Sequence, residues 1–297
     1  MKLAVQSDFF IQNYGLEKGL EYIKTIGYQQ MIYNFSERYD GPFATEWTDT
    51  ELENFYTPIG KAANKIGLDI PFTLVEGAIY NDLLPETFEA RKKLCIQALK
   101  ATAYMGCNVM GIRPVSFYYS HEDVLKTTKD ISNGMFQLLK TEADRLGIRL
   151  AFVNNNRVRV FSSGSYSYGC RISELMELAN KYEAGIIIDP VNAHLAGERA
   201  EELIIGAGDM LVGVLLRDVE TDGETPAMTR MGILDYDEIA RALKKADPNA
   251  TAVMMSNAVH ERYADFHAED SFVTALNELL FEMGNVIVGS EVGRKMP

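Results

Sequence analysis

Short apolar segments alternate with segments of helical periodicity along the whole sequence, and this alternation limits the folds that the chain can adopt. Eight apolar segments are each followed by a helical pattern. Strands are predicted over residues 2–7, 31–35, 68–75, 109–112, 148–153, 186–188, 211–216 and 251–255. Helices are predicted over residues 16–26, 47–66, 94–105, 120–147, 172–179, 198–207, 235–246 and 272–283. This pattern requires parallel strands with helices outside them.

Eight strand–helix units close naturally into a (β/α)8 TIM barrel, which is an α/β fold. The competing fold is an open doubly wound sheet, which usually carries a glycine-rich phosphate turn after its first strand. Residues 8–14, Asp-Phe-Phe-Ile-Gln-Asn-Tyr, contain no glycine and are interpreted as an aromatic loop. We therefore predict a single TIM-barrel domain over residues 1–297, with a short C-terminal tail from about residue 285.

The composition excludes some partners and indicates a compartment. Apolar residues make up 47% of the chain and charged residues 24%, as in globular proteins. The net charge, 29 basic minus 42 acidic residues, is −13, which argues against a nucleic-acid partner. Residues 1–10 do not resemble a signal peptide, no apolar run is long enough to span a membrane, and the three cysteines lack metal-site spacing. We expect a cytoplasmic protein with no membrane partner.

The segment 185–197, Gly-Ile-Ile-Ile-Asp-Pro-Val-Asn-Ala-His-Leu-Ala-Gly, contains the strongest candidate for a catalytic residue. Asp189 directly follows three isoleucines, and barrel strands open onto the active site at their C-terminal ends. A carboxylate in such a place must be paired, hydrogen-bonded or shifted in pKa. His194 is the second catalytic candidate, and a surface histidine is an equally good interpretation of it.

Other polar residues fall at the predicted strand ends, where they could bind a small carbohydrate. The candidate substrate-binding residues are Arg113, Asn154, Asn155, Asn192, Arg217, Asp218, Ser256 and Asn257. Amides and arginines suit hydroxyl, carboxylate and phosphate groups. Two structural interpretations stay open: the asparagines could satisfy loop backbone groups, and Arg217 with Asp218 could form an ion pair on the rim.

Aromatic residues lie in or beside the predicted loops after the strands. They are Phe9, Phe10, Tyr14, Phe43, Trp47, Tyr118 and Tyr119. They could form the apolar wall on which a sugar ring stacks, or a patch at which two copies form a homodimer. The Ser- and Tyr-rich segment 162–169 could donate hydrogen bonds to an anion or form a polar loop.

Four motifs carry a resemblance to a known family. They are 150–155 (Leu-Ala-Phe-Val-Asn-Asn), 189–197, 215–218 (Leu-Leu-Arg-Asp) and 232–236 (Gly-Ile-Leu-Asp-Tyr). The chain resembles the xylose isomerase-like TIM barrels, the sugar-phosphate isomerase/epimerase group that includes tagatose epimerases, inosose dehydratases and endonuclease IV. The resemblance implies a divalent metal held by a Glu after strand five, an Asp after strand six, a His on strand seven and a Glu after strand eight.

Three of these four ligands are replaced in this sequence. The first glutamate falls at Val153, the histidine at Leu215 and the last glutamate at Met255 or Ser256, and Asp189 alone remains. One hard ligand in four cannot hold Mg²⁺ or Mn²⁺. We therefore predict no metal ligands and no cofactor, and leave open a weakly bound divalent metal.

Two further positions depart from the family pattern. A second family histidine falls at Asn192, with His194 two positions late. The turn before the seventh helix keeps Gly232 but has Arg230 in place of an earlier glycine.

The resemblance and the altered ligands together lead to two functional hypotheses. The first is a sugar or sugar-derivative isomerase or epimerase that is metal-poor or metal-free and uses Asp189 with His194 or an arginine for proton transfer. The second is a family member without catalysis that binds carbohydrate or serves as a scaffold. DNA repair of the endonuclease IV type is disfavoured by the net charge of −13.

Overall fold

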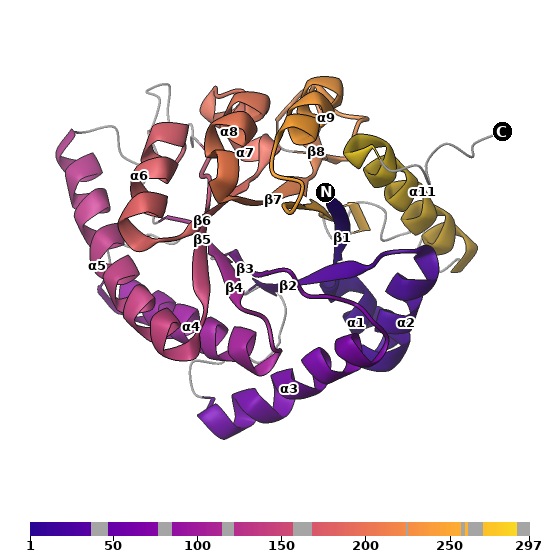
Figure 1. Ribbon diagram of the computed structural model, residues 1–297, viewed down its shortest axis with the longest axis horizontal. Coiled ribbons are helices and arrows are strands. Elements are labelled where there is room, and N and C mark those ends of the chain that lie inside the picture. Colours follow the sequence, from indigo (N-terminus) through magenta and orange to yellow (C-terminus); the bar gives the residue numbers. More distant parts are fainter. Residues whose placement is uncertain are drawn as a thin grey trace.

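A closed barrel of parallel strands surrounded by helices forms the centre of the computed structural model (Figure 1). The structure describes residues 1–36, 47–76, 85–114, 122–156, 168–223, 225–256, 259–260 and 270–289. The barrel strands are β1 (Lys2–Gln6), β2 (Gln30–Ser36), β3 (Thr73–Glu76), β4 (Val109–Ile112), β5 (Arg149–Val153), β6 (Gly185–Ile188), β7 (Leu211–Leu216) and β10 (Thr251–Met254). Their spatial order is β1-β10-β7-β6-β5-β4-β3-β2, so that the first and last strands pair and the predicted (β/α)8 barrel is confirmed.

The outer helices follow the strands along the chain. They are α1 (Asp8–Tyr14), α2 (Leu16–Ile26), α3 (Asp49–Lys65), α4 (Pro85–Tyr104), α5 (Glu122–Leu146), α6 (Ile172–Tyr182), α7 (Pro190–Ala196), α8 (Ala200–Ala207), α9 (Tyr236–Lys245) and α11 (Asp270–Val288). Two short strands, β8 (Asp218–Val219) and β9 (Pro226–Ala227), form an antiparallel pair after β7. In the part of the chain that is described, no helix is both long enough and apolar enough to cross a membrane.

Successive side chains along each strand point alternately into the barrel and out toward the helices, so the protein has two apolar cores. The inner core fills the barrel with Ala4, Ile32, Phe72, Leu74, Ala151, Val153, Ile187, Leu215, Val253 and Met255. The other buried side chains pack between the strands and the helices. At two inward positions only glycine fits, because a Cβ on Gly111 would lie 2.8 Å from Ile187 Cδ1, and one on Gly213 would lie 2.7 Å from the Phe72 ring. The barrel is a packed core, as the fold requires.

Residues 8–14 form a helix and not the aromatic loop that was expected. Phe9 and Phe10 are buried in the core, and the N–H of Ile11 donates to the carbonyl of Ser7. Gly19 allows α2 to approach α1 closely, since a Cβ there would lie 2.5 Å from the Phe10 carbonyl oxygen. Tertiary packing therefore produces a helix that the local pattern did not indicate.

Several predicted boundaries need correction. β3 begins at Thr73 instead of residue 68, because Pro71 has no N–H for the ladder. The helix expected over 47–66 begins at Asp49, where Thr48 and Glu51 form a reciprocal capping box. Helix α11 continues to Val288, with Asn285 and Ile287 buried, so any C-terminal tail begins after residue 285.

Candidate functional site

Asp189 lies at the carboxyl end of β6, where the chain leaves the barrel and enters α7. Its side chain is fully buried, and it caps the helix by accepting from the N–H groups of Val191 at 3.1 Å and Asn192 at 3.3 Å. Pro190 at the first helical position has no N–H to satisfy, as suits a helix start. The prediction that this carboxylate must be paired or hydrogen-bonded is confirmed.

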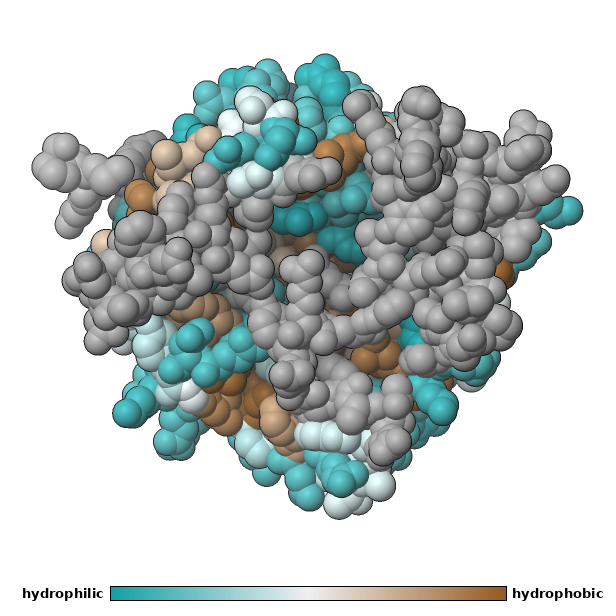
Figure 2. Space-filling view, turned by 180° about the vertical axis from the view of Figure 1, so that it is seen from behind, coloured by the Kyte–Doolittle hydropathy of each residue, from teal (hydrophilic) through white to brown (hydrophobic). Residues whose placement is uncertain are grey.

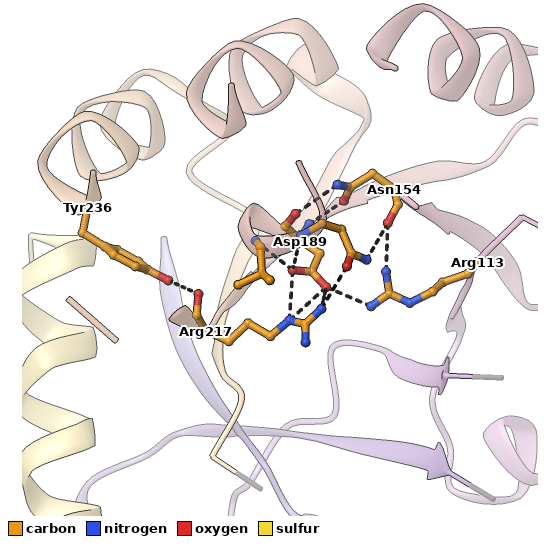
Figure 3. A network of polar contacts seen from close by, with 7 residues as sticks. Arg113, Asn154, Asp189, Arg217 and Tyr236 are labelled. Carbon is orange, nitrogen blue, oxygen red and sulfur yellow. Dashed lines mark hydrogen bonds and ion pairs between the residues drawn. The ribbon is translucent and has the colours of Figure 1, made fainter. Parts of the chain in front are cut away.

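Two arginines contact the carboxylate of Asp189: Arg217, just after β7, and Arg113, just after β4 (Figure 3). Arg217 donates from Nη2 to Oδ2 at 2.6 Å and from Nε to Oδ1 at 3.0 Å and to Oδ2 at 3.1 Å. Arg113 donates from Nη2 to Oδ2 at 2.9 Å. The expected ion pair of Arg217 with Asp218 is therefore wrong, because Arg217 pairs with Asp189.

Strand geometry explains why these three residues meet. Arg113, Asp189 and Arg217 each lie two positions beyond an inward-facing residue, namely Gly111, Ile187 and Leu215. Side chains two residues apart on a strand share a face. The charged cluster therefore continues the inner face of the barrel beyond its apolar core, at the carboxyl ends of β4, β6 and β7.

Two asparagines hold this cluster together. The side-chain amide of Asn154 accepts from the Asp189 N–H at 2.6 Å and donates to the Asp189 carbonyl at 3.0 Å. The carbonyl of Asn154 accepts from Arg113 Nη1 at 2.8 Å and from Asn192 Nδ2 at 3.0 Å. Asn192 Oδ1 in turn accepts from Arg217 Nη2 at 3.1 Å. The structure thus brings together five of the predicted site residues: Arg113, Asn154, Asp189, Asn192 and Arg217.

The charges around Asp189 set its protonation. Burial alone would raise the pKa of this carboxyl, but the positive charges of Arg217 and Arg113 and their hydrogen bonds outweigh it and hold the pKa below its ordinary value. Asp189 is therefore ionised near neutral pH and is a weak base. The contacts of the Asp189 carboxylate therefore suit a role in holding the two arginines better than a role as the base that accepts a proton from a substrate.

Asn155 and Asp218 contact backbone. Asn155 Nδ2 donates to the carbonyls of Pro114 and Tyr168, both at 2.8 Å. The carboxylate of Asp218 accepts from the N–H groups of Val219, Gly232 and Leu234. Burial raises the pKa of Asp218 above its ordinary value, although these hydrogen bonds act in the opposite direction. Asp218 fixes the loop between β9 and α9, and its role as a substrate contact stays a prediction.

The remaining predicted site residues lie apart from the cluster or outside the described residues. His194 is exposed in the last turn of α7. Ser256 is buried just after β10, and its Oγ makes no hydrogen bond to the described residues. Asn257 lies outside the described residues, as do Phe43, Tyr118, Tyr119 and most of the segment 162–169.

Tyr236 and His260 are buried near the strand ends and were not predicted as site residues. Tyr236, the first residue of α9, donates from its hydroxyl to the Arg217 carbonyl at 2.7 Å (Figure 3). Burial raises the pKa of this hydroxyl well above its ordinary value, so it remains a donor. His260 stacks on Phe9 with ring centroids 3.5 Å apart, and its Nε2 lies 3.0 Å from Asn277 Oδ1. The sequence feature that could have pointed to His260 is its position five residues beyond the predicted last strand.

The donor set around Asp189 does not fit a divalent metal ion. The resemblance to the family predicts its other ligand positions at Val153, Leu215 and either Met255 or Ser256, and the first three of these residues belong to the inner apolar core. Both Asp189 oxygens accept from arginine nitrogens. Among the described residues, no group of three or more His, Cys, Asp or Glu side chains is arranged to hold a metal. The absence of a bound metal stays a prediction of the sequence.

The face opposite to that of Figure 1 is hollowed near its centre, and hydrophilic residues form part of the hollow (Figure 2). A closed (β/α)8 barrel with polar side chains at the carboxyl ends of its strands defines a class in which binding and catalysis occur at that end. The fold and the polar cluster thus define a TIM barrel with polar side chains gathered at the end of the barrel where this fold class binds ligands.

Comparison with known proteins identifies the family. Residues 20–279 match the family described as xylose isomerase-like TIM barrel, and the chain belongs to this family. No curated protein sequence matches the chain.

Several solved structures share the fold at low sequence identity. A candidate xylose isomerase from Rhodospirillum rubrum is 18% identical with a TM-score of 0.72, and the match covers 98% of this chain and 99% of that one. A D-psicose 3-epimerase from Clostridium cellulolyticum, crystallised with D-tagatose, is 13% identical with a TM-score of 0.66, over 97% of this chain and 99% of that one. A 3-keto-D-glucoside 4-epimerase from E. coli is 15% identical with a TM-score of 0.64, over 90% and 98%.

Proposed function

We propose that the protein is an isomerase or epimerase of a small carbohydrate or carbohydrate derivative, and that it works without the divalent metal of its family. The observation that carries the proposal is the cluster of Arg217 and Arg113 on Asp189 at the carboxyl end of the barrel. The family membership and the sugar epimerases among the structural neighbours support this class of reaction.

The chemistry of such a reaction requires a positive group near the substrate oxygens. Removal of a proton next to a sugar carbonyl leaves negative charge on the carbonyl oxygen, and pre-positioned donors lower the energy of that state. A guanidinium provides charge and directed N–H groups together. In this proposal Arg217 and Arg113 bind the substrate oxygens, and Asp189 holds the two guanidinium groups in place.

Proton transfer needs a group that can change its charge near neutral pH. The lowered pKa of Asp189 makes it a poor base, so in this proposal Asp189 is the anchor, and proton transfer falls to His194 or to an arginine. His194 is exposed on α7, the helix that Asp189 caps, and histidine is the side chain that most often acts as a general acid or base.

The second candidate function is carbohydrate binding without catalysis. It is favoured by the apolar residues Val153, Leu215 and Met255 at the family's ligand positions and by the weak basicity of Asp189. The arginine cluster would bind sugar oxygens equally well in this case. The two functions therefore differ only in whether a carbon–hydrogen bond breaks.

Isotope exchange distinguishes the two functions. Chelator-treated protein is incubated in D₂O with a panel of aldoses and ketoses, and deuterium at the carbon next to the carbonyl is followed by NMR. Catalysis predicts deuterium incorporation and a second isomer, with the rate reduced about 10–100-fold in Arg217→Gln, which loses charged hydrogen bonds. Arg241→Gln, at an exposed arginine on α9, should behave as the parent. Binding without exchange supports the second function, and exchange only after Mn²⁺ is added contradicts the metal-free proposal.

A further inference from the structure

The last residue of β1, Gln6, is a polar residue on the inner face of the barrel. Ala4, two positions earlier on the same strand, belongs to the inner apolar core, and side chains two residues apart on a strand share a face. Gln6 is buried, with 3% of its surface exposed. Its amide therefore lies at the carboxyl end of the barrel, where this fold class binds ligands.

The side-chain amide of Gln6 makes no hydrogen bond to the residues that the structure describes. Its neighbour on β2 is Ile32, and its neighbour on the other side is Met255, which follows the Met254 that pairs with Val5. Both neighbours belong to the inner apolar core, and neither side chain carries nitrogen or oxygen. Because a buried amide without a hydrogen bond costs free energy, water or a bound ligand is the partner that remains for Gln6.

A second glutamine at the opposite end of the barrel provides a comparison. Gln30, the first residue of β2, lies two positions before inward-facing Ile32 and is also buried, with 5% of its surface exposed. Its Oε1 accepts from the hydroxyl of Thr251 at 3.2 Å. The two inward-facing glutamines therefore differ in one respect: the amide at the amino end of the barrel has a partner among the described residues, and the amide at the carboxyl end has none.

Gln6 lies across the barrel end from the Asp189 cluster. In the strand order of the closed barrel, β1 and β2 lie opposite β5 and β6. Asn34 of β2, two positions beyond inward-facing Ile32, is buried at the same end and is a second polar residue on this side. A ligand held at the carboxyl end of the barrel therefore has Asp189 and its partners on one side and Gln6 on the other.

We propose that the side-chain amide of Gln6 is a specificity-determining residue of this site and binds an uncharged hydroxyl group of the ligand. An amide and a hydroxyl can each donate and accept a hydrogen bond, whereas an ionised carboxylate can only accept, so a hydroxyl is the group that matches the amide best. The inference rests on the carbohydrate function proposed above, and it adds that the ligand places one hydroxyl against β1, across the barrel end from Asp189.

The first measurement compares the stability of two matched variants without ligand. Gln6→Met keeps the length of the side chain and removes an amide that has no partner among the described residues, so its melting temperature should equal or exceed that of the parent. Gln30→Met removes the acceptor of the Thr251 hydroxyl and should lower the melting temperature by about 2–4 °C. A residue that binds ligand and a residue that holds the fold are thereby distinguished.

The second measurement is a calorimetric binding titration with D-glucose, D-fructose and their monodeoxy derivatives, which does not depend on turnover. Gln6→Met should weaken binding of the preferred hexose about 5–20-fold, as expected for the loss of one hydrogen bond to a hydroxyl, and Gln30→Met should bind it as the parent does. One monodeoxy sugar should bind the parent more weakly by a similar factor. The same sugar should show no further loss in Gln6→Met, because the amide that the missing hydroxyl contacts is already absent.

Some results would overturn the inference and leave the proposed function standing. These are hexose binding that is unchanged in Gln6→Met, losses for every monodeoxy sugar that are the same in Gln6→Met as in the parent, and a melting temperature of Gln6→Met that falls as far as that of Gln30→Met. Failure of every hexose to bind the parent at millimolar concentration would overturn the carbohydrate function and this inference together. Hexose binding that depends on Gln6, without isotope exchange, would support the inference and contradict only the proposed catalysis.

Discussion

Arg217 and Asp189 lie 28 residues apart in sequence and form a two-nitrogen contact, with Nη2 at 2.6 Å and Nε at 3.0–3.1 Å from the carboxylate oxygens. The contact joins the ends of two neighbouring strands, β6 and β7. The carboxylate of Asp189, which the resemblance predicts to be a metal ligand, therefore pairs with a guanidinium in this protein.

The effects of substitutions at Arg217 and Asp189 on the free energy of unfolding should be strongly coupled. Arg217→Met leaves a buried carboxylate with Arg113 as its remaining charged partner and should lower the free energy of unfolding by about 1.5–3 kcal/mol. The double variant Arg217→Met/Asp189→Asn should recover part of this loss, because no unpaired charge remains. Urea unfolding of the four proteins in the cycle gives the coupling energy. Arg241→Met removes only an exposed pair with Glu238 and should leave the free energy of unfolding almost unchanged. Equal losses in Arg217→Met and Arg241→Met would contradict this account.

Protonation of Asp189 should lower the stability of the folded protein in acid. Its pKa is lower in the folded state than in the unfolded chain, so its contribution is complete above the unfolded pKa of about 3.9 and is lost as the pH falls through the folded pKa. Asp218 acts in the opposite direction, because burial raises its pKa and its contribution decreases as the pH rises above the unfolded value. Unfolding free energies of parent and Asp189→Asn should converge as the pH is lowered from 6 toward 3. A constant difference would mean that Asp189 is not ionised in the folded protein.

Backbone strain at Arg230 gives a prediction about the loop between β9 and α9. Arg230 has φ of 70°, in the left-handed region, and the resemblance to the family predicts a glycine at this position. Arg230→Gly should stabilise the protein by about 0.5–1 kcal/mol, because relief of strain exceeds the entropy cost of glycine. The ion pair with Asp237 is exposed and contributes little. Gly147→Ala, at φ of 70° with no atom within 4 Å of the added Cβ, should destabilise by a similar amount. A loss of stability in Arg230→Gly, measured by urea unfolding, would contradict the strain argument.

Restoring the family's ligands should require removal of Arg217. The sequence placed the last ligand at Met255 or Ser256, and Met255 is the one that joins Val153 and Leu215 in the inner core. Val153→Glu, Leu215→His and Met255→Glu each bury a polar group and should each cost about 1–3 kcal/mol. With Arg217 present we expect no rise in melting temperature with Mn²⁺, and with Arg217→Met added we expect a rise. The version with Ser256→Glu in place of Met255→Glu is the control and should not respond.

The barrel could be predicted from sequence because its strands are short apolar segments between clear boundaries. β4 and β7 have the predicted ends, and an arginine directly follows each of them, Arg113 after β4 and Arg217 after β7. Helix α1 could not be predicted, because Phe9 and Phe10 become helical through contacts with α2. The β8–β9 pair was also missed, since two residues on each side give no periodic signal.

The sequence predicted which residues form the cluster, but only some of the contacts between them. Strand alternation placed Arg113, Asp189 and Arg217 at the barrel end, but it could not choose between Asp189 and Asp218 as the partner of Arg217. That choice depends on three backbone N–H groups that hold Asp218 in the following loop. Such loop contacts are set by the fold and leave no pattern in the sequence.

The most direct test of the central claim is a metal titration of the protein with and without Asp189. Purified protein is analysed for its metal content, and melting temperatures are then recorded against Mn²⁺ and Mg²⁺ for the parent and for Asp189→Asn. If Arg217 pairs with Asp189 in place of a metal ion, the parent should contain no stoichiometric metal and its melting temperature should not rise with either ion. Near-stoichiometric metal in the parent, together with a Mn²⁺-dependent rise in melting temperature that Asp189→Asn abolishes, would contradict the account.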